Sequence, residues 1–388
     1  MQFRDLSKQY ACLKTQIDCA IQDVLLSSNF ISGGPVKKLE KVLADYVGVK
    51  HCITCANGTD ALTIALKAWN IGKGDAVFVP DFTFFSSGEC PAGLGATPIF
   101  VDVDSSTYNM DPEQLEVAVQ NILAEGRLTP KVVVAVDLFG LPANYEKIKK
   151  VCDKYSLFLL EDGAQGFGGE FKGKKACSFG DISTTSFFPA KPLGCYGDGG
   201  AIFTDNGSWA DLIRSLCVHG KDTSNPNDPN SKYNNLRIGF NSRLDSIQAA
   251  VLLQKFESFK SNELHDINRV AKWYRECFIA EEISDVELPC IDNDFYSSWA
   301  QYTVQVPSYV NRSELQKKLK ELGIPTNVYY MKPMHLQGAF SGTRSETADC
   351  PITERLCSSV LSLPIDPFKT KDEVAYVVSS IKEFLKNN

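Results

Sequence analysis

Between about residue 35 and residue 205, short runs of apolar and β-branched residues alternate with segments that have the period of an amphipathic helix. AVFVPDFTF leads through a segment of small residues to TPIFVDVD, and KVVVAVDLFG leads through the helical NYEKIKKVCDKY to LFLLED. Crossovers of this kind join parallel strands, so the alternation predicts βαβ units around a mainly parallel sheet. This order of elements limits the chain to the α/β class of folds.

The alternation gives way to one long helical pattern, GFNSRLDSIQAAVLLQKFESF, and then to a less regular, proline-containing stretch. We therefore expect a large domain at residues 1–258 and a smaller C-terminal domain at residues 259–388. A chain of 388 residues with 44% hydrophobic and 22% charged residues can bury two cores. The segment DTSNPNDPNSKYNN, residues 222–235, has no apolar period and is predicted to be a surface loop.

The charge and the apolar runs exclude several classes of partner. The formal net charge is −7, and no block of Lys and Arg contradicts it, so we expect neither a nucleic acid nor an anionic membrane as a general partner. The start MQFRDLSKQYACLKTQ lacks the apolar core of a signal peptide, and no run approaches the roughly 18 apolar residues of a membrane span. The expected location is the cytoplasm.

The cysteines and histidines do not form a disulfide or metal pattern. In the cytoplasm, 13 scattered cysteines are expected to be reduced and mostly buried thiols. Cys52 and Cys55 lie in a predicted strand, where residues three apart point to opposite faces, so a redox pair is not expected. No metal is expected either, because no HExxH or Cys/His pattern includes any of the histidines. These are His51, His219, His265 and His335.

Three aspartates end predicted strands: Asp81, Asp137 and Asp162. In open α/β sheets, ligands bind outside the carboxyl ends of the strands, so each of these aspartates is a candidate site residue by position. The alternative for each is a structural role, in which the carboxylate caps the helix or turn that follows.

One lysine, Lys191, stands in an unusually rigid and apolar stretch, SFFPAKPLGCYGDGG. Pro189 and Pro192 restrict the backbone on both sides of it. A lysine held in a partly dehydrated pocket favours its neutral amine, which is the form that reacts with an aldehyde cofactor. The alternative is an ordinary lysine on an exposed loop.

The stretch CANGTDAL ends a predicted strand and begins a helix. Gly58, Thr59 and Asp60 would offer backbone N–H groups and a hydroxyl at the helix N-terminus, which is a site suited to a phosphate, although these residues could also simply cap the helix. Asp162 could keep a pyridine nitrogen protonated, as an electron-sink cofactor requires. Together with Lys191, these features predict a site for a phosphorylated aldehyde cofactor.

At this point the motifs resemble a known family, the DegT/DnrJ/EryC1/StrS sugar aminotransferases, a branch of the fold-type I pyridoxal phosphate (PLP) enzymes. The similarity runs from FRDLSKQY through CANGTDAL, EDGAQGFGGEFKGKKA and SFFPAKPLGCYGDGGAIFT to VYYMKPMHLQ and LSLPIDP. It implies a three-layer α/β/α large domain with a mainly parallel sheet, followed by a smaller C-terminal α+β domain.

The resemblance also implies roles for residues around the cofactor. Lys191 matches the Schiff-base lysine of the family, Asp162 the partner of the pyridinium nitrogen, and Gln165 the residue that contacts the ring oxygen. Phe84 matches an aromatic residue stacked on the ring. Gly58, Thr59 and Ser186 match the phosphate site. Asn241 matches an asparagine that reaches the phosphate from the neighbouring subunit, which implies a homodimer with shared active sites.

The implied reaction moves an amino group, from glutamate in relatives, to a nucleotide-linked keto-sugar. The motifs are most similar to enzymes that aminate C3 of UDP-linked 3-keto-N-acetyl-hexuronates, and such products serve polysaccharide and lipopolysaccharide biosynthesis. Arg243 is then a candidate for a substrate carboxylate or phosphate, or alternatively for an interface salt bridge. Those relatives carry a His-Tyr pair where this chain has Tyr329 and Tyr330, both expected to contact substrate. A neutral UDP- or dTDP-keto-6-deoxysugar, aminated at C3 or C4, therefore remains an alternative.

Other classes of function have distinguishing features. The dehydratases of this family have histidine at the lysine position, and this chain has Lys191. A non-catalytic PLP-binding regulator would bring a DNA-binding segment, which this acidic chain does not display. A nicotinamide-dependent sugar dehydrogenase would place GxGxxG directly after its first strand, and NGTDAL does not fit that pattern.

Overall fold

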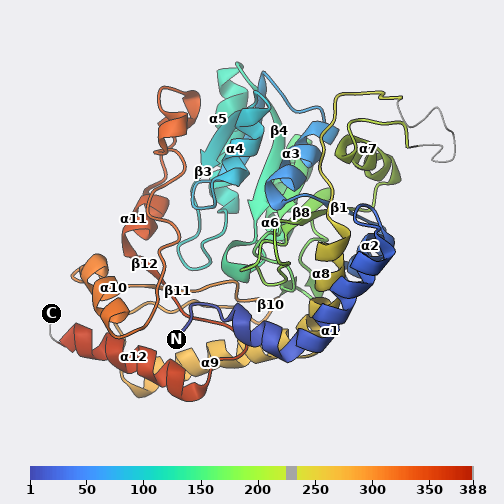
Figure 1. Ribbon diagram of the computed structural model, residues 1–388. Helices are drawn as coiled ribbons and strands as arrows, with labels where there is room; N and C mark the ends of the chain where they lie inside the picture. Colours follow the sequence, from blue (N-terminus) through green and yellow to red (C-terminus); the bar gives the residue numbers. More distant parts are fainter. Residues whose placement is uncertain (224–233, 387–388) are drawn as a thin grey trace.

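The computed structural model describes residues 1–223 and 234–386, so residues 224–233 of the predicted surface loop lie outside the described residues. A seven-stranded sheet forms the centre of the molecule (Figure 1), in the order β1-β9-β8-β5-β4-β2-β3. Strands β2, β3, β4, β5 and β8 pair in parallel, and only β9 runs antiparallel to its two neighbours in this sheet. The mainly parallel sheet is confirmed. Its strands are β1 (His51–Cys55), β2 (Asp75–Pro80), β3 (Thr97–Val101), β4 (Thr129–Val136), β5 (Phe158–Asp162), β8 (Ile182–Ser186) and β9 (Gly200–Thr204).

The strands bury both faces, because their apolar residues are continuous rather than alternating with polar ones. Val77 and Val79 join one hydrophobic cluster, and Ala76 and Phe78 join the cluster on the opposite face. One face of the sheet packs on α3 (Gly58–Ala68), α4 (Ser86–Gly93) and α7 (Gly207–Cys217). The other face packs on α5 (Pro112–Glu125) and α6 (Tyr145–Tyr155). Helices α2 (Gly34–Val47) and α8 (Ser246–Ser258) pack at β1 and β9. The predicted three-layer α/β/α arrangement is therefore confirmed.

The two cysteines of β1 lie on opposite faces of the sheet, as the strand period predicts. Cys52 packs in the cluster with α2 and α8, whereas Cys55 packs in the cluster with α3 and α7. Both thiols are free, and burial raises the pKa of each well above its ordinary value. They therefore do not form a disulfide with each other.

The C-terminal part has its own hydrophobic cluster, which begins at Ile267 and ends at Ile381. The helix of α8 continues through a π-helical turn, Phe259–Glu263, and so passes through the predicted boundary at residue 258 without a break. The division of domains at that residue remains a prediction. The other elements are α9 (Leu264–Ala280), α10 (Arg312–Glu321), α11 (Pro351–Ser359) and α12 (Lys371–Lys386), the pair β11 (Tyr302–Gln305) and β12 (Val360–Leu363), and the short β6 (Glu170–Phe171), β7 (Lys174–Lys175) and β10 (Phe295–Tyr296).

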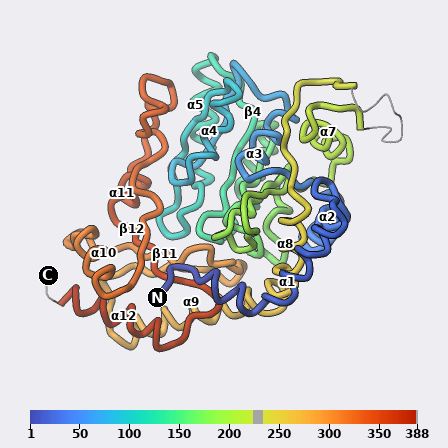
Figure 2. The backbone as a smooth tube through the Cα atoms, viewed as in Figure 1, coloured from blue at the N-terminus to red at the C-terminus, as the bar shows by residue number. Residues whose placement is uncertain are grey.

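The first residues of the chain lie against the C-terminal part, as Figure 2 shows where the blue end of the tube enters among the orange and red elements. The backbone N–H of Ile365 donates to the carbonyl of Phe3 at 3.1 Å, and Lys369 donates to the carbonyl of Gln2 at 2.9 Å. Helix α1 (Leu6–Ser27) then runs along α8. Of the helices in residues 1–223 and 234–386, none is long and apolar enough to cross a membrane.

Candidate active site

A cavity of about 710 Å³ lies at the carboxyl ends of β5 and β8, beside the start of α3. Residues from the central sheet and from the segment between α10 and α11 line it together. Nine residues singled out from the sequence are among its lining: Gly58, Thr59, Phe84, Asp162, Gln165, Ser186, Lys191, Tyr329 and Tyr330. The fold therefore brings residues 58 and 330 of the chain into one site.

Asp162 forms part of the floor of this cavity. It is the last residue of β5 and is 5% exposed. The Ser87 hydroxyl donates to Oδ2 at 2.8 Å, and the Ala164 N–H donates to Oδ1 at 3.2 Å. Burial raises the pKa of Asp162, while these hydrogen bonds and the charge of Lys191 oppose the rise. A cationic ring nitrogen would stabilise this carboxylate in the same way.

Lys191 lies in the loop that follows β8. Two backbone hydrogen bonds shape this loop, from Lys191 N–H to the Phe188 carbonyl at 2.9 Å and from Cys195 N–H to the Phe187 carbonyl at 2.7 Å. Burial lowers the pKa of the Lys191 amine, the Asp162 carboxylate raises it, and the charge of Arg4 lowers it. The net shift favours a neutral amine, which is the nucleophilic form.

The start of α3 forms the polar end of the cavity. Asn57 caps the helix by accepting the Asp60 N–H at 2.7 Å. The hydroxyls of Thr59 and Ser86 lie 2.8 Å apart. A Cβ on Gly58 would come within 2.8 Å of the Ser186 Cβ, so only glycine lets the helix start approach this strand end. Hydroxyls and free helix N–H groups at one point suit a phosphate.

An aromatic residue and an amide complete the part of the cavity that would receive a ring. Phe84 is 54% exposed although it is large and apolar, and it lines the cavity. Gln165 accepts the Phe139 N–H with Oε1 at 3.0 Å and donates from Nε2 to the Tyr330 hydroxyl at 3.1 Å. Its second amide hydrogen is available to a ring oxygen. The residues present therefore fit PLP at its amine, ring and phosphate ends.

The other two strand-end aspartates do not line the cavity, so their candidacy as site residues is wrong. Asp81 accepts the backbone N–H of His335 at 2.8 Å and its ring Nδ1–H at 2.7 Å. Asp137 accepts the Tyr145 hydroxyl at 2.6 Å and the Ala143 N–H at 3.0 Å. Both carboxylates are buried and are used to fix neighbouring chain segments, which is the structural alternative.

Asn241 and Arg243 also lie outside the cavity lining of their own chain. Asn241 is exposed, and the Arg243 guanidinium donates a hydrogen bond to its Oδ1. One chain therefore does not bring these residues together with Lys191, and their predicted role depends on a second subunit.

The sequence analysis missed several residues of the site. Ser86 and Ser87 support the polar end and Asp162 respectively, and the exposed Lys332 lines the cavity beside Tyr329 and Tyr330. The two serines follow directly after Phe84 and Phe85, just beyond the predicted strand AVFVPDFTF, and this position was the available signal. Lys332 lies within the quoted motif VYYMKPMHLQ, where only the two tyrosines were weighed.

The buried side chains of Asp81, His335 and Cys350 have the composition of a metal-ligand group, with ligand atoms within 4.8 Å of one another. The hydrogen bond to Asp81 raises the pKa of His335, which favours the imidazolium, and an imidazolium has no free lone pair for a metal. The expectation of no metal therefore remains a prediction, and the geometry is that of a hydrogen-bonded Asp–His pair.

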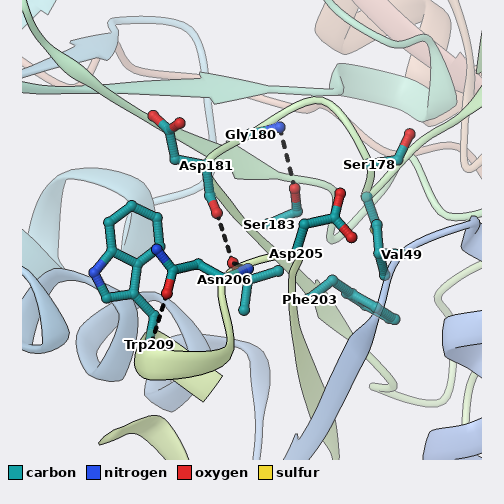
Figure 3. A pocket seen from close by; sticks show the side chains of 11 residues that line it. Val49, Ser178, Gly180, Asp181, Ser183, Phe203, Asp205, Asn206 and Trp209 are labelled. Atoms are coloured by element: carbon teal, nitrogen blue, oxygen red, sulfur yellow. Dashed lines mark hydrogen bonds between the residues drawn. The ribbon is translucent and has the colours of Figure 1, made fainter. Parts of the chain in front are cut away.

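A second cavity, of about 430 Å³, has a different chemistry (Figure 3). Its lining includes Asp181, Asp205 and Asn206, but none of its described lining residues is a lysine or an arginine. The carboxylates accept backbone N–H groups at 2.8 Å, Asp181 from Leu159 and Asp205 from Lys50. Asn206 caps α7. These polar groups therefore bind the backbone of the protein itself. The described lining of this cavity has no lysine beside its carboxylates, in contrast to Asp162 and Lys191 in the first cavity.

Comparison with known proteins assigns this fold and site to a class. The model of the DegT/DnrJ/EryC1/StrS aminotransferase family matches residues 11–382. The chain is 40% identical over 383 residues to the UDP-2-acetamido-2-deoxy-3-oxo-D-glucuronate aminotransferase of Pseudomonas aeruginosa, covering 98% of this chain and 99% of the relative. It is 35% identical to the UDP-N-acetyl-3-dehydro-α-D-glucosamine 3-aminotransferase of Acidithiobacillus ferrooxidans, covering 98% and 97%.

A solved structure gives the same answer for the fold. A DegT DnrJ EryC1 StrS aminotransferase from Brucella abortus superposes with a TM-score of 0.92 at 43% identity and covers 99% of both chains. The fold and site define a PLP-dependent aminotransferase. The chain belongs to the DegT/DnrJ/EryC1/StrS aminotransferase family. This membership sets aside the dehydrogenase considered from the sequence.

Proposed function

We propose that this aminotransferase transfers an amino group from glutamate to C3 of a UDP-linked 2-acetamido-3-keto-hexuronate. The observation that carries the transamination is the pairing of Lys191 with the buried Asp162 in one cavity. The position of amination is supported by the names of two relatives, which specify a 3-oxo or a 3-dehydro sugar. The uronate is supported by the relative at 40% identity.

PLP supplies an electron sink for the carbon that loses and regains a proton. Asp162 holds the pyridine nitrogen in its protonated form, and Phe84 and Gln165 orient the ring. Gly58, Thr59 and Ser186 bind the phosphate at the start of α3.

Lys191 has two tasks in this proposal. Its neutral amine would hold PLP through the aldehyde carbon, with loss of water, and as a free amine its Nζ would move a proton at the substrate carbon. Both tasks need an amine that loses its proton readily, and burial lowers the pKa of Lys191 in that direction. Asp162 opposes this shift and keeps the amine from becoming too weak a base.

The substrate is anionic, and two cations are candidates for its carboxylate. Lys332 lines the cavity together with Tyr329 and Tyr330. No ion pair within 4.0 Å is found for Lys332 among the described residues, so its ammonium is available to an anion. Arg243 would reach the site only from a second subunit. We assign the carboxylate to Lys332 and retain Arg243 as the competing candidate.

The functional unit is proposed to be a homodimer with shared sites. Large apolar side chains are exposed at the cavity, where Phe84 and Phe188 are 54% and 53% exposed. Others are exposed on α1 and before α8, where Leu26 is 77% and Ile238 is 85% exposed. A second copy of the chain would cover such surfaces. Asn241, in the segment that contains Ile238, would then reach the partner's phosphate site.

The role of Lys191 is tested by borohydride reduction of the PLP-loaded enzyme and peptide mapping. The pyridoxyl label is expected on Lys191. A label on another lysine would contradict the assignment, and Lys191→Ala, which removes the amine, is the control that must lose the label at this peptide.

Shared sites are tested by mixing two inactive variants, Lys191→Ala and Asn241→Ala. Heterodimers contain one site with both native residues, so partial activity is expected once the subunits exchange. Differently tagged copies measure the exchange. No recovery in proven heterodimers would mean that Asn241 serves its own chain or none.

The neutral keto-sugar remains the second candidate, because Tyr329 replaces the histidine of the uronate enzymes and a tyrosine brings no positive charge at neutral pH. A panel of UDP- and dTDP-keto-sugars, with and without the carboxylate, decides between them. Higher kcat/KM for the neutral sugar would overturn the uronate. The cytoplasmic location and the role in polysaccharide or lipopolysaccharide biosynthesis are further predictions of the proposal.

A further inference from the structure

The N-terminal segment, residues 1–5, is fixed between the C-terminal part and the large sheet domain. The Met1 amino group donates to the Gly323 carbonyl at 3.2 Å, and the Asp5 N–H donates to Asp366 Oδ2 at 3.1 Å. The ring of Phe3 meets the ring of Tyr329 edge-on, with centroids 6.4 Å apart. Phe3 of the segment therefore contacts a residue that lines the active-site cavity.

Arg4 projects from this segment to the lysine loop. Its Nη1 donates to the carbonyl of Ala190 at 2.8 Å, and Ala190 is the residue directly before Lys191. Arg4 is partly buried. The two acids that act on it electrostatically, Asp366 and Glu263, are engaged elsewhere: Asp366 Oδ2 pairs with Lys369 at 2.6 Å, and Glu263 accepts from Gln9 at 2.7 Å.

A second basic residue holds the same loop, and burial lowers its pKa to about 8. Lys255 of α8 is 1% exposed, and its Nζ donates to the carbonyl of Gly194. Lys191 thus lies between two carbonyls, at residues 190 and 194, that are each fixed by a cation. The two cations differ in one respect: the charge of Arg4 acts on the Lys191 amine, whereas Lys255 is not among the groups that shift its titration.

We propose that Arg4 is a positioning residue for Lys191: its guanidinium fixes the Ala190 carbonyl and places a permanent positive charge behind the reactive amine. The inference rests on the proposed function in taking Lys191 as the cofactor lysine. No role is assigned to Arg4 by the family resemblance or by the relatives. Arg4, although it is close to the N-terminus, thereby contributes to the electrostatics of the active site.

The sign of the electrostatic effect follows from the groups that face Lys191. Burial lowers the pKa of the amine, Asp162 of β5 raises it, and Arg4 of the N-terminal segment lowers it. Asp198 and Lys332 line the same cavity. Removal of the Arg4 charge therefore raises the pKa of Lys191, and a smaller fraction of the amine is neutral at a given pH.

The test measures Lys191 itself in the cofactor-free full-length protein. Trace labelling with acetic anhydride across a pH series, with mass spectrometry of the Lys191 peptide, gives the midpoint at which the amine becomes reactive. Arg4→Met should move this midpoint to higher pH, because a positive charge that lowers the pKa of Lys191 is lost. Arg4→Lys keeps the charge and should move it by less than half as much.

Lys255→Met is the matched control, because it also removes a basic side chain that holds the loop by a hydrogen bond to a backbone carbonyl. It should loosen the loop with little change in the Lys191 midpoint. An unchanged midpoint in Arg4→Met, or an equal shift in Lys255→Met, would overturn the proposal. If Lys255→Met does not fold, Arg312→Gln replaces it, since Arg312 also donates to backbone carbonyls, at 2.6 Å to Cys357.

The failure of this inference and the failure of the proposed function give different results. Borohydride labelling of a residue other than Lys191 would contradict the proposed function, whereas the acetylation midpoints do not involve the cofactor. A label on Lys191 together with identical midpoints in wild type and Arg4→Met would refute the role of Arg4 alone.

Discussion

The floor and the rim of the active-site cavity are built differently. Asp162 of the floor ends β5 and accepts hydrogen bonds from Ser87 of α4 and from Ala164, whereas Lys191 follows β8 in a loop that has its own backbone hydrogen bonds. The rim residues Tyr329, Tyr330 and Lys332 come from an irregular segment of the C-terminal part. The proposed cofactor-binding residues thus lie at the ends of sheet strands, and the proposed substrate contacts lie on a segment that can vary without altering the sheet.

The two regions also differ in their electrostatics. Burial raises the pKa of Asp162 and lowers that of Lys191, so floor groups are poised for proton transfer. Lys332 on the rim is exposed, and solvent screens its charge. We therefore expect substitutions in the floor to affect every substrate strongly, and substitutions in the rim to affect substrates selectively and less.

The largest effect is expected for Asp162→Asn. The variant should fold, but kcat with any keto-sugar should fall about 10²–10³-fold, equivalent to about 3–4 kcal/mol, because a buried charge partner is lost. Steady-state kinetics and circular dichroism check the two parts. Near-normal kcat in a folded variant would show that the floor does not hold the ring nitrogen through this carboxylate.

A smaller, selective effect is expected for Lys332→Gln. With a UDP-keto-uronate, kcat/KM should fall about tenfold, less than the about 2–5 kcal/mol of a buried charge pair because Lys332 is exposed. With the matching neutral keto-sugar it should stay within about twofold. Lys317→Gln, an exposed lysine of α10 outside the cavity lining, controls for the change of net charge.

Arg243→Gln gives the competing result. If the neighbouring subunit supplies the carboxylate-binding cation, Arg243→Gln should show the selective loss and Lys332→Gln should not. Equal losses with both sugars would place Arg243 at a phosphate or in the interface, and would remove it from substrate selection.

Ser87→Ala should have a moderate effect on the floor. It removes the hydroxyl that donates to Asp162 Oδ2 at 2.8 Å, at a cost of about 0.5–1.5 kcal/mol, or about threefold to tenfold in kcat. This hydrogen bond lowers the pKa of Asp162, so its loss raises that pKa. The acid limb of the kcat profile should move to higher pH, and a profile unchanged in position would contradict the assignment.

The smallest effect is expected for Tyr329→Phe. Its hydroxyl accepts a hydrogen bond from Asn327 at 3.3 Å and carries no charge at neutral pH. The kcat/KM values for uronate and neutral sugar should fall by no more than a few-fold, and by equal factors. A selective loss with the uronate would mean that this tyrosine replaces the histidine of relatives in substrate recognition.

Local sequence patterns were sufficient to predict the residues of the cavity floor, but they could not distinguish the three strand-end aspartates from one another. The strands of the βαβ units, the start of α3 at Gly58 and the rigid loop around Lys191 follow from period, capping and proline placement. Three aspartates shared the same position at strand ends, and the pattern could not rank them. Only the packing of His335 on Asp81 and of Tyr145 on Asp137 removed those two from the site.

The amino-acid sequence by itself determined the α/β class, the order of the strands along the chain and the chemical types gathered in the floor, because these depend on local period and on motifs. The tertiary structure alone decided which residues meet across long separations. Arg4 reaches a carbonyl 186 residues away, and Lys332 lines a cavity whose floor lies at Asp162. Such contacts depend on how the start and the C-terminal part of the chain pack on the sheet, and no local pattern encodes that packing.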